Sequence, residues 1–226
     1  MKKFSLLILC AGFGKRMLDL TTNTPKPLLE FKNNTLLGNA INFFNNIGCN
    51  EIFINTHYLH TKIEEYVIKN FDNNLLNIIY EPSILGTGGA IKNIFNYTKN
   101  KKMCVVNSDI FWTNDNKQDV VNFLKNSNDA TYCKILLSKK NNFYGLKKNN
   151  GDFNIRNGFI SKWTEGDEVI FYSGMQVLSK KIFQNSEKIF TMNNIWNSLI
   201  IDKKLKGDFI SSNILHIGDK NSFHDY

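Results

Sequence analysis

Short apolar runs alternate with segments whose apolar residues recur every three or four positions from residue 4 to residue 137. The runs predict buried strands, and the recurring positions predict helices that bury one face. Strands are expected at 4–10, 51–56, 77–80, 103–107 and 130–137, and helices at 39–46, 60–69, 89–97 and 119–125. Repeated alternation of strand and helix predicts a parallel sheet with helices on both faces.

The pattern changes in the remaining third of the chain, where strand-like segments are separated by Asn, Gly and Asp turns. Strands are expected at 145–147, 153–155, 158–163 and 169–178, and helices at 179–184 and 192–203; a final apolar stretch covers 214–217. We therefore predict an α/β fold: a Rossmann-like, mostly parallel sheet with a small antiparallel extension over its ligand edge. No linker or repeat interrupts the sequence, so one domain over 1–226 is expected.

Composition narrows the classes of function. The net charge is +8, but the lysines are scattered, which disfavours nucleic-acid binding and favours an anionic small-molecule substrate. No apolar stretch reaches the ~18 residues of a membrane span, and the first apolar run lacks a cleavage pattern. The four cysteines lie far apart without a C-x-x-C pair, which indicates reduced thiols in a cytoplasmic protein.

The first strand is followed by Gly12-Phe13-Gly14-Lys15-Arg16 and then by Pro25-Lys26-Pro27. Glycines there let the backbone close around an anion, and the cations suit a polyphosphate. Met17 breaks the dinucleotide fingerprint, and the P-loop pattern also fails at two positions. The segment therefore predicts a triphosphate site of another type at the carboxyl end of the first strand.

Two further segments add polar groups at the same predicted edge. Asp109 follows the apolar strand at 103–107, where a carboxylate is typical of a metal-bridged phosphate site, although it could also cap a turn. A second glycine-rich turn at 85–90 leaves room for a flat base or a sugar, or simply leads into a helix. Glu81, just before that turn, could accept hydrogen bonds from a base edge.

With these motifs in place, the chain resembles the sugar-1-phosphate nucleotidyltransferases. Their motifs L-x-A-G-x-G-x-R-M/L and P-K-P-L/M fit residues 9–17 and 25–28. The family's E-P-x-G-T-x-G-A-I segment fits 81–91, its N-G-D fits 107–109, and its Y-G fits 144–145. The resemblance covers nearly the whole chain and implies the nucleotide-diphospho-sugar transferase type of the α/β fold.

The resemblance also implies roles for the matching residues. The catalytic residues would be Arg16, Lys26 and Asp109. The nucleotide would contact Leu9, Ala11, Gly12, Phe13, Gly14, Lys15, Glu81, Gly86 and Thr87. The sugar phosphate would contact Asn107, Gly145, Glu165 and Gly174.

The expected cofactor is Mg²⁺, with Mn²⁺ as an alternative, held by Asp109. The family's second metal-binding Asp belongs where this chain has His216. Imidazole is a poor ligand for Mg²⁺, which prefers hard oxygen ligands. This leaves either His216 or Asp219 as a doubtful second ligand.

The implied activity joins a nucleoside triphosphate to a sugar 1-phosphate and releases pyrophosphate. Uridylyl transfer to a hexose-type sugar phosphate is the first expectation, from the resemblance to N-acetylmuramate-1-phosphate uridylyltransferases. Guanylyl transfer to mannose- or heptose-1-phosphate and cytidylyl transfer to phosphocholine are alternatives. A regulatory protein that binds nucleotide sugars with little catalysis is the alternative of another class. The oligomeric state stays open.

Overall fold

Strands form the centre of the molecule. The computed structural model describes residues 4–127, 132–146 and 148–226. The long strands are β1 (Phe4–Leu9), β4 (Cys49–Thr56), β5 (Leu76–Tyr80), β6 (Lys102–Asn107), β8 (Cys133–Lys139), β10 (Phe153–Arg156), β11 (Phe159–Lys162), β12 (Ile170–Ser179) and β13 (Leu205–Phe209). The short strands are β2 (Glu30–Phe31), β3 (Asn34–Thr35), β7 (Ile110–Phe111), β9 (Phe143–Tyr144) and β14 (Ile214–His216).

Helices connect these strands. The α-helices are α1 (Leu36–Asn46), α2 (His60–Asn70), α3 (Gly86–Ile94), α4 (Lys117–Lys125), α5 (Met192–Ile201) and α6 (Lys220–Asp225). The 3₁₀ turns are η1 (Lys15–Thr21), η2 (Lys26–Leu28), η3 (Asn73–Leu75), η4 (Asn114–Asn116), η5 (Lys140–Asn142) and η6 (Lys180–Phe183). No described helix is both long and apolar enough to cross a membrane.

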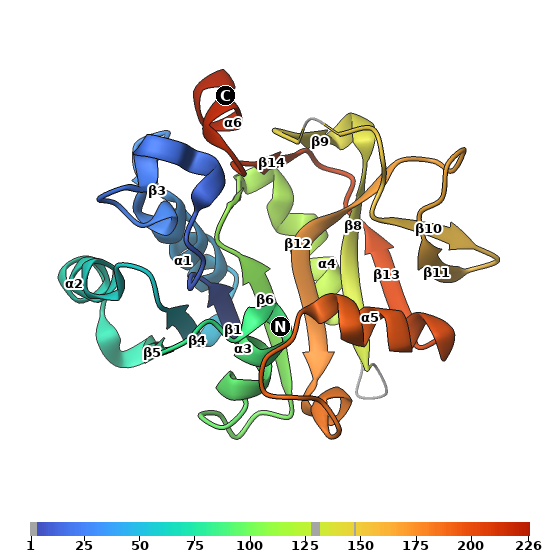
Figure 1. The fold of residues 1–226 in the computed structure, drawn as a ribbon, viewed down its shortest axis with the longest axis horizontal. Helices are drawn as coiled ribbons and strands as arrows, with labels where there is room; N and C mark the ends of the chain where they lie inside the picture. Colours follow the sequence, from blue (N-terminus) through green and yellow to red (C-terminus); the bar gives the residue numbers. More distant parts are fainter. Residues whose placement is uncertain (1–3, 128–131, 147) are drawn as a thin grey trace.

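The large sheet has the order β11-β10-β12-β6-β1-β4-β5, and β8 and β13 extend from β12 (Figure 1). Strands β6, β1, β4 and β5 run parallel, so their carboxyl ends share one edge. Strand β12 runs antiparallel to β6 and β8, and β10 pairs with β11 as an antiparallel hairpin. The predicted fold class, a mostly parallel α/β sheet with an antiparallel extension, is confirmed.

Alternation of side chains along the strands divides the core between the two faces of the sheet. Leu6 and Ile8 pack in the cluster that receives α1, α2 and α4, whereas Leu7 packs in the cluster that receives α3 and α5. Figure 1 shows α5 in front of the sheet and α4 behind it. The buried residues of β1 and β6 are therefore fixed from both sides, which makes the strand ends a rigid base for a site.

Several predicted boundaries are wrong in the second half of the chain. Residues 145–146 are not a strand, because Gly145 turns with a φ of +84°; residue 147 lies outside the described residues. The helix expected at 179–184 is the single 3₁₀ turn η6, and the helix expected at 192–203 ends at Ile201. The strand expected at 130–137 runs over Cys133–Lys139, and residues 130–131 lie outside the described part.

Three helices begin earlier than the apolar pattern predicted, and α4 does so by two residues, at Lys117. Helix α1 begins at Leu36 because the Thr35 hydroxyl accepts a hydrogen bond from Gly38 N at 2.9 Å and caps the helix. Helix α3 begins at Gly86 instead of Gly89. The glycine-rich segment therefore forms the start of α3 rather than a turn before it.

Candidate nucleotide-binding site

A cleft of about 480 Å³ lies at the carboxyl ends of the parallel strands. It brings together most residues that the sequence predicted to be functional. These are Leu9, Ala11, Gly12, Phe13, Gly14, Lys15, Arg16, Lys26, Glu81, Gly86, Thr87, Asn107 and Asp109. Chain segments from residue 9 to residue 218 thus line one concave surface.

The segment after β1 forms one wall of the cleft. Cys10 N donates to Asn55 Oδ1 at 3.0 Å, which ties the start of the loop to the end of β4. Gly14 has a φ of +65°, and a Cβ there would stand 3.0 Å from Lys26 Cβ, so glycine is required. A Cβ at Gly12 would meet nothing within 4 Å. The backbone at Gly12 is therefore open to a ligand.

Lys26 and Asp109 form a buried ion pair beside this loop. Lys26 Nζ lies 2.8 Å from Asp109 Oδ2 and donates to Gly218 O at 3.2 Å. The flanking Pro25 and Pro27 restrict the backbone at the start of η2, and the Lys26 residue is only 8% exposed. An ammonium group has three N–H donors, so the third can reach a ligand in the cleft.

His216 is the second side chain that contacts the carboxylate of Asp109. Strand β14 pairs antiparallel with β7, which puts His216 opposite Ile110, the residue that follows Asp109. His216 Nε2 lies 3.4 Å from Asp109 Oδ2. Burial by itself would raise the pKa of Asp109, but Lys26 and His216 outweigh it and hold the pKa well below its usual range.

Asp219, the other doubtful metal ligand, is the N-cap residue of α6. Its Oδ1 accepts from Ser222 N at 2.8 Å and caps α6. Burial would raise the pKa of Asp219, but the Ser222 hydrogen bonds, with attraction from Arg16 and His216, lower it overall. Neither Asp219 nor His216 lines the cleft. Arg16 lines the cleft and is exposed, so its guanidinium is accessible to a ligand that enters the cleft.

One residue of the cleft, Asp109, is suited to bind a divalent cation. Asp109 Oδ1 is buried without a hydrogen-bond partner, and this carboxylate lines the cleft. Among the residues that the structure describes, no group of three or more His, Cys, Asp or Glu side chains could surround a metal ion. Mg²⁺ is commonly held by one or two carboxylates together with substrate phosphates and water, and that requirement matches a single carboxylate.

Glu81 forms the far end of the cleft. It follows β5, is 2% exposed, and its Oε1 accepts from Asn55 Nδ2 at 3.0 Å. Burial raises the pKa of Glu81, and hydrogen bonds from Asn55 and the Leu85 backbone only partly offset this rise. His57 Nδ1 lies 2.7 Å from the backbone oxygen of Glu81. Asn55 therefore links the loop after β1 to this carboxylate.

The glycines of the second turn pack closely against the segment before α5. Phe190 O accepts from Gly88 N at 3.0 Å and Gly89 N at 3.1 Å. A Cβ at Gly88 would overlap the Phe190 ring, and one at Gly86 would lie 2.5 Å from Phe190 O. Two of the small residues predicted to admit a base thus serve packing, whereas Gly86 and Thr87 also line the cleft.

Three predicted sugar-binding residues do not line the cleft: Gly145, Glu165 and Gly174. Gly174 still lies beside it, because a Cβ there would stand 3.5 Å from Asn107 Cβ. Gly145 packs against the His216 backbone. Both glycines have a φ of +84°, so each has a conformational reason to be glycine apart from any ligand.

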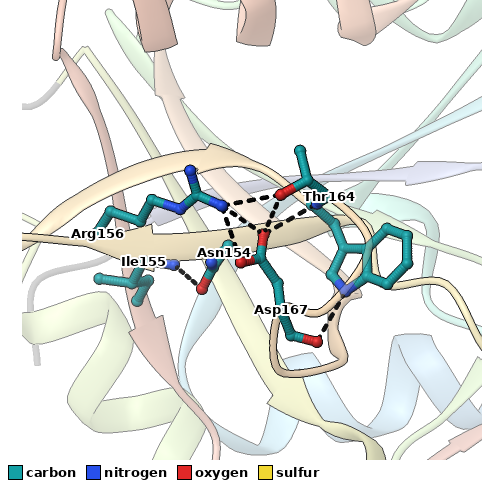
Figure 2. A network of polar contacts seen from close by, with 6 residues as sticks. Asn154, Ile155, Arg156, Thr164 and Asp167 are labelled. Atoms are coloured by element: carbon teal, nitrogen blue, oxygen red, sulfur yellow. Dashed lines mark hydrogen bonds and ion pairs between the residues drawn. The ribbon is translucent and has the colours of Figure 1, made fainter.

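Glu165 lies on the β11–β12 loop, whose shape is set by Arg156 and Asp167 (Figure 2). Arg156 Nη2 donates to both oxygens of Asp167, at 2.8 and 3.0 Å, and to Thr164 Oγ1 at 2.8 Å. The Arg156 contact and hydrogen bonds from Thr164 hold the pKa of Asp167 well below its usual range. Glu165 itself is exposed on this loop.

Sequence reasoning missed Asn55 and Gly218 as parts of the site. Asn55 is a polar residue near the end of an otherwise apolar strand, and that position was a usable signal. Gly218 carried no such signal, since its role is to present a carbonyl to Lys26. The four cysteines are buried and unpaired, and burial raises the pKa of Cys49 and Cys133 to about 12.

Comparison with known proteins identifies the architecture. A family model described as nucleotidyl transferase matches residues 5–209. The chain belongs to the nucleotidyl transferase family. The resemblance of the sequence motifs to the sugar-1-phosphate nucleotidyltransferases is thereby confirmed.

Curated relatives of this nucleotidyl transferase chain differ in their stated substrates. A D-glycero-alpha-D-manno-heptose 1-phosphate guanylyltransferase of Aneurinibacillus thermoaerophilus is 31% identical over 109 residues, which cover 48% of this chain and 47% of the relative. An N-acetylmuramate alpha-1-phosphate uridylyltransferase of Neisseria meningitidis serogroup B is 35% identical over 107 residues, 46% of each chain. The matches span about half the length of these relatives.

Solved structures agree on the fold of this nucleotidyl transferase. HddC from Yersinia pseudotuberculosis, crystallised with GMP-PN, gives a TM-score of 0.78 at 23% identity and covers 98% of this chain and 97% of that one. A UDP-glucose pyrophosphorylase complexed with UDP-glucose gives 0.77 at 14% identity, covering 99% and 97%. Members with different nucleotide ligands thus share the same chain path.

Proposed function

We propose that this protein transfers a nucleoside monophosphate from a nucleoside triphosphate to a sugar 1-phosphate. The observation that carries the proposal is the buried Lys26–Asp109 pair in a cleft that the glycine loop at 12–14 also lines. The pair puts a fixed ammonium group and a carboxylate where a triphosphate would meet both. Relatives that act on sugar 1-phosphates support the substrate class.

The reaction needs no covalent intermediate. An oxygen of the sugar 1-phosphate attacks the α-phosphorus, a new P–O bond forms, and the bond to pyrophosphate breaks. Backbone amides near Gly12 would hold phosphate oxygens, Arg16 would neutralise the departing pyrophosphate, and Lys26 would contact the α-phosphate. Asn107, beside Gly174, would face the sugar phosphate.

Asp109 would hold Mg²⁺ or Mn²⁺ through its unpartnered Oδ1. Such a cation neutralises phosphate charge in the transition state. The remaining ligands would come from the nucleotide and water. Lys26 and His216 keep the Asp109 carboxylate ionised, so it is ready to accept the cation.

The candidate activities differ in the base of the nucleotide that is transferred. Uridylyl transfer to a hexose-type sugar phosphate stays a prediction, as do guanylyl transfer to mannose- or heptose-1-phosphate and cytidylyl transfer to phosphocholine. Both guanylyl- and uridylyltransferases stand among the relatives. The likeness to the HddC structure supports the fold only.

The test is pyrophosphate release across four nucleoside triphosphates and a panel of sugar 1-phosphates, each with Mg²⁺ and with Mn²⁺. We expect release that depends on both substrates and is lost in Lys26→Met. Glu51→Gln is a matched folding control, since Glu51 accepts from Ser5 and Thr98 outside the cleft lining. Absence of release with every pair would contradict the proposal.

A second candidate, a protein that binds nucleotides without turnover, is favoured by one observation. Asp109 contacts Lys26 and His216. Among the described residues that line the cleft, the only other carboxylate is Glu81, which is distant from Asp109. Calorimetry separates the two functions. Nucleotide binding with no pyrophosphate release under any metal would favour the binding protein.

A further inference from the structure

We propose that Glu81 selects guanine, so that the nucleotide substrate is a guanosine triphosphate. The inference rests on the proposed function for its phosphate chemistry. It runs against the uridylyl expectation from the sequence motifs. Its basis is the carboxylate of Glu81 at the end of the cleft away from the cations.

The sheet order sets the two ends of the cleft apart. Asp109 follows β6 and Glu81 follows β5, and these strands are separated by β1 and β4. Three strand spacings amount to about 14 Å. Lys15, Arg16 and Lys26 belong to the segments that follow β1. A nucleotide with its phosphates on these cations and on Asp109 therefore extends its base across β4 towards Glu81.

The surroundings of Glu81 leave it with acceptor capacity. A carboxylate has about four acceptor positions. Asn55 Nδ2 and the Leu85 backbone account for two hydrogen bonds. In the described part of the chain, none of the ion pairs includes Glu81. A buried carboxylate with unfilled acceptor positions is stabilised by further N–H donors, which a ligand can supply.

The four bases differ in what they offer a carboxylate. Guanine presents two adjacent donors, N1–H and the N2 amino group, and both can point at one carboxylate. Uracil presents a single N–H between two carbonyl oxygens, which a carboxylate repels. Adenine and cytosine each place a ring-nitrogen acceptor beside their amino group. A site with an acceptor pair left unfilled therefore discriminates against these three bases.

Small residues give the base its space. Gly86, Ala90 and Ala11 line the same cleft as Glu81. A Cβ at Gly86 would lie 2.5 Å from Phe190 O, so a larger residue there would shift this wall. The aliphatic side chain of Ile84 adds an apolar surface to the lining. The part of the lining that residues 81–90 contribute is thus apolar apart from Thr87 and the carboxylate.

Isothermal titration calorimetry with GTP, ITP, UTP, CTP and ATP, without sugar phosphate, tests the inference. Inosine lacks only the N2 amino group of guanine, so the ratio of GTP to ITP affinity measures that one contact. We expect GTP to bind about tenfold more tightly than ITP, as one hydrogen bond to a charged acceptor implies, and more tightly than the other three. Tighter binding of UTP than of GTP would overturn the inference.

The same titrations with the variant Glu81→Gln test whether Glu81 causes the preference for GTP over ITP. We expect its GTP-to-ITP ratio to fall to about one, because an amide oxygen is uncharged and the amide nitrogen repels the donors. Glu51→Gln, a change of the same kind outside the cleft, should keep the wild-type ratio. An unchanged ratio in Glu81→Gln would contradict the inference. If Glu81→Gln does not fold, the wild-type ratio still decides.

Turnover separates the two proposals. Pyrophosphate release with UTP but not with GTP would overturn the guanine assignment and leave nucleotidyl transfer standing. Selective GTP binding with no release for any sugar phosphate would support the guanine assignment and contradict nucleotidyl transfer.

Discussion

Gly218 lies flat against the imidazole of His216: a Cβ built on Gly218 would overlap Cε1 of that ring. The same glycine presents its carbonyl to Lys26 Nζ at 3.2 Å. Gly218 therefore contacts both side chains that pair with Asp109, Lys26 and His216. The carboxylate is held by groups that are themselves positioned by the backbone after β14.

We predict that Gly218→Ala destabilises the protein by about 1–3 kcal/mol, the usual cost of overpacking a buried site. The His216 ring must move, and its contact with Asp109 changes with it. Urea unfolding measures the effect. Gly12→Ala is the control for stability, because a Cβ there meets nothing within 4 Å. Equal stability of the two variants would refute the packing argument.

Lys26→Met is expected to reduce stability and activity together. Removing one member of a buried pair leaves an uncompensated carboxylate, which costs about 3–5 kcal/mol. Loss of the cation should slow pyrophosphate release by about 100-fold or more. The double variant Lys26→Met/Asp109→Asn should recover stability without recovering activity, since no unpaired carboxylate remains. A double variant less stable than Lys26→Met would exclude this explanation.

Asp109 makes stability depend on acid pH. Its pKa is lowered from 3.8, so the folded form binds the proton more weakly than the unfolded chain does. The stabilisation is therefore complete above that value and declines as pH falls below it. Denaturant unfolding between neutral pH and pH 3 should show a shallower decline in Asp109→Asn than in wild type. Parallel curves would contradict the assignment.

His216→Asp adds a carboxylate next to Asp109, and Mg²⁺ gains a second hard ligand. We expect Mg²⁺ to bind about tenfold more tightly, since carboxylate charge raises affinity for this ion. Calorimetric titration of the nucleotide complex gives the affinity directly. His216→Asn, which removes the imidazole without adding charge, is the comparison. The same Mg²⁺ affinity in all three proteins would place residue 216 away from the ion.

Arg156→Ala should loosen the β11–β12 loop without affecting the core. Arg156 is 57% exposed and its partner Asp167 only 14%, so the pair orders a surface loop. Hydrogen exchange over residues 163–168 should accelerate, while the unfolding midpoint changes little. Arg156→Lys should recover part of the protection. Unchanged exchange would mean that Thr164 and the backbone alone hold the loop.

The sequence by itself determined the parallel half of the fold and the residue types of the predicted phosphate site after β1. Apolar runs such as Phe4–Leu9 alternate sides with every residue, and the glycines and cations that follow act through local backbone geometry. Those features need no partner elsewhere in the chain. They therefore predicted Gly12, Gly14, Arg16 and Lys26 as neighbours of a ligand.

Only the tertiary structure decided which distant residues meet. Lys26 and Asp109 are 83 positions apart, and Lys26 and Gly218 are 192 apart. Their contacts depend on sheet order and on the pairing of β14 with β7, which puts His216 rather than Asp219 beside Asp109. Which strands become neighbours depends on packing over the whole core, and local periodicity alone does not fix that order.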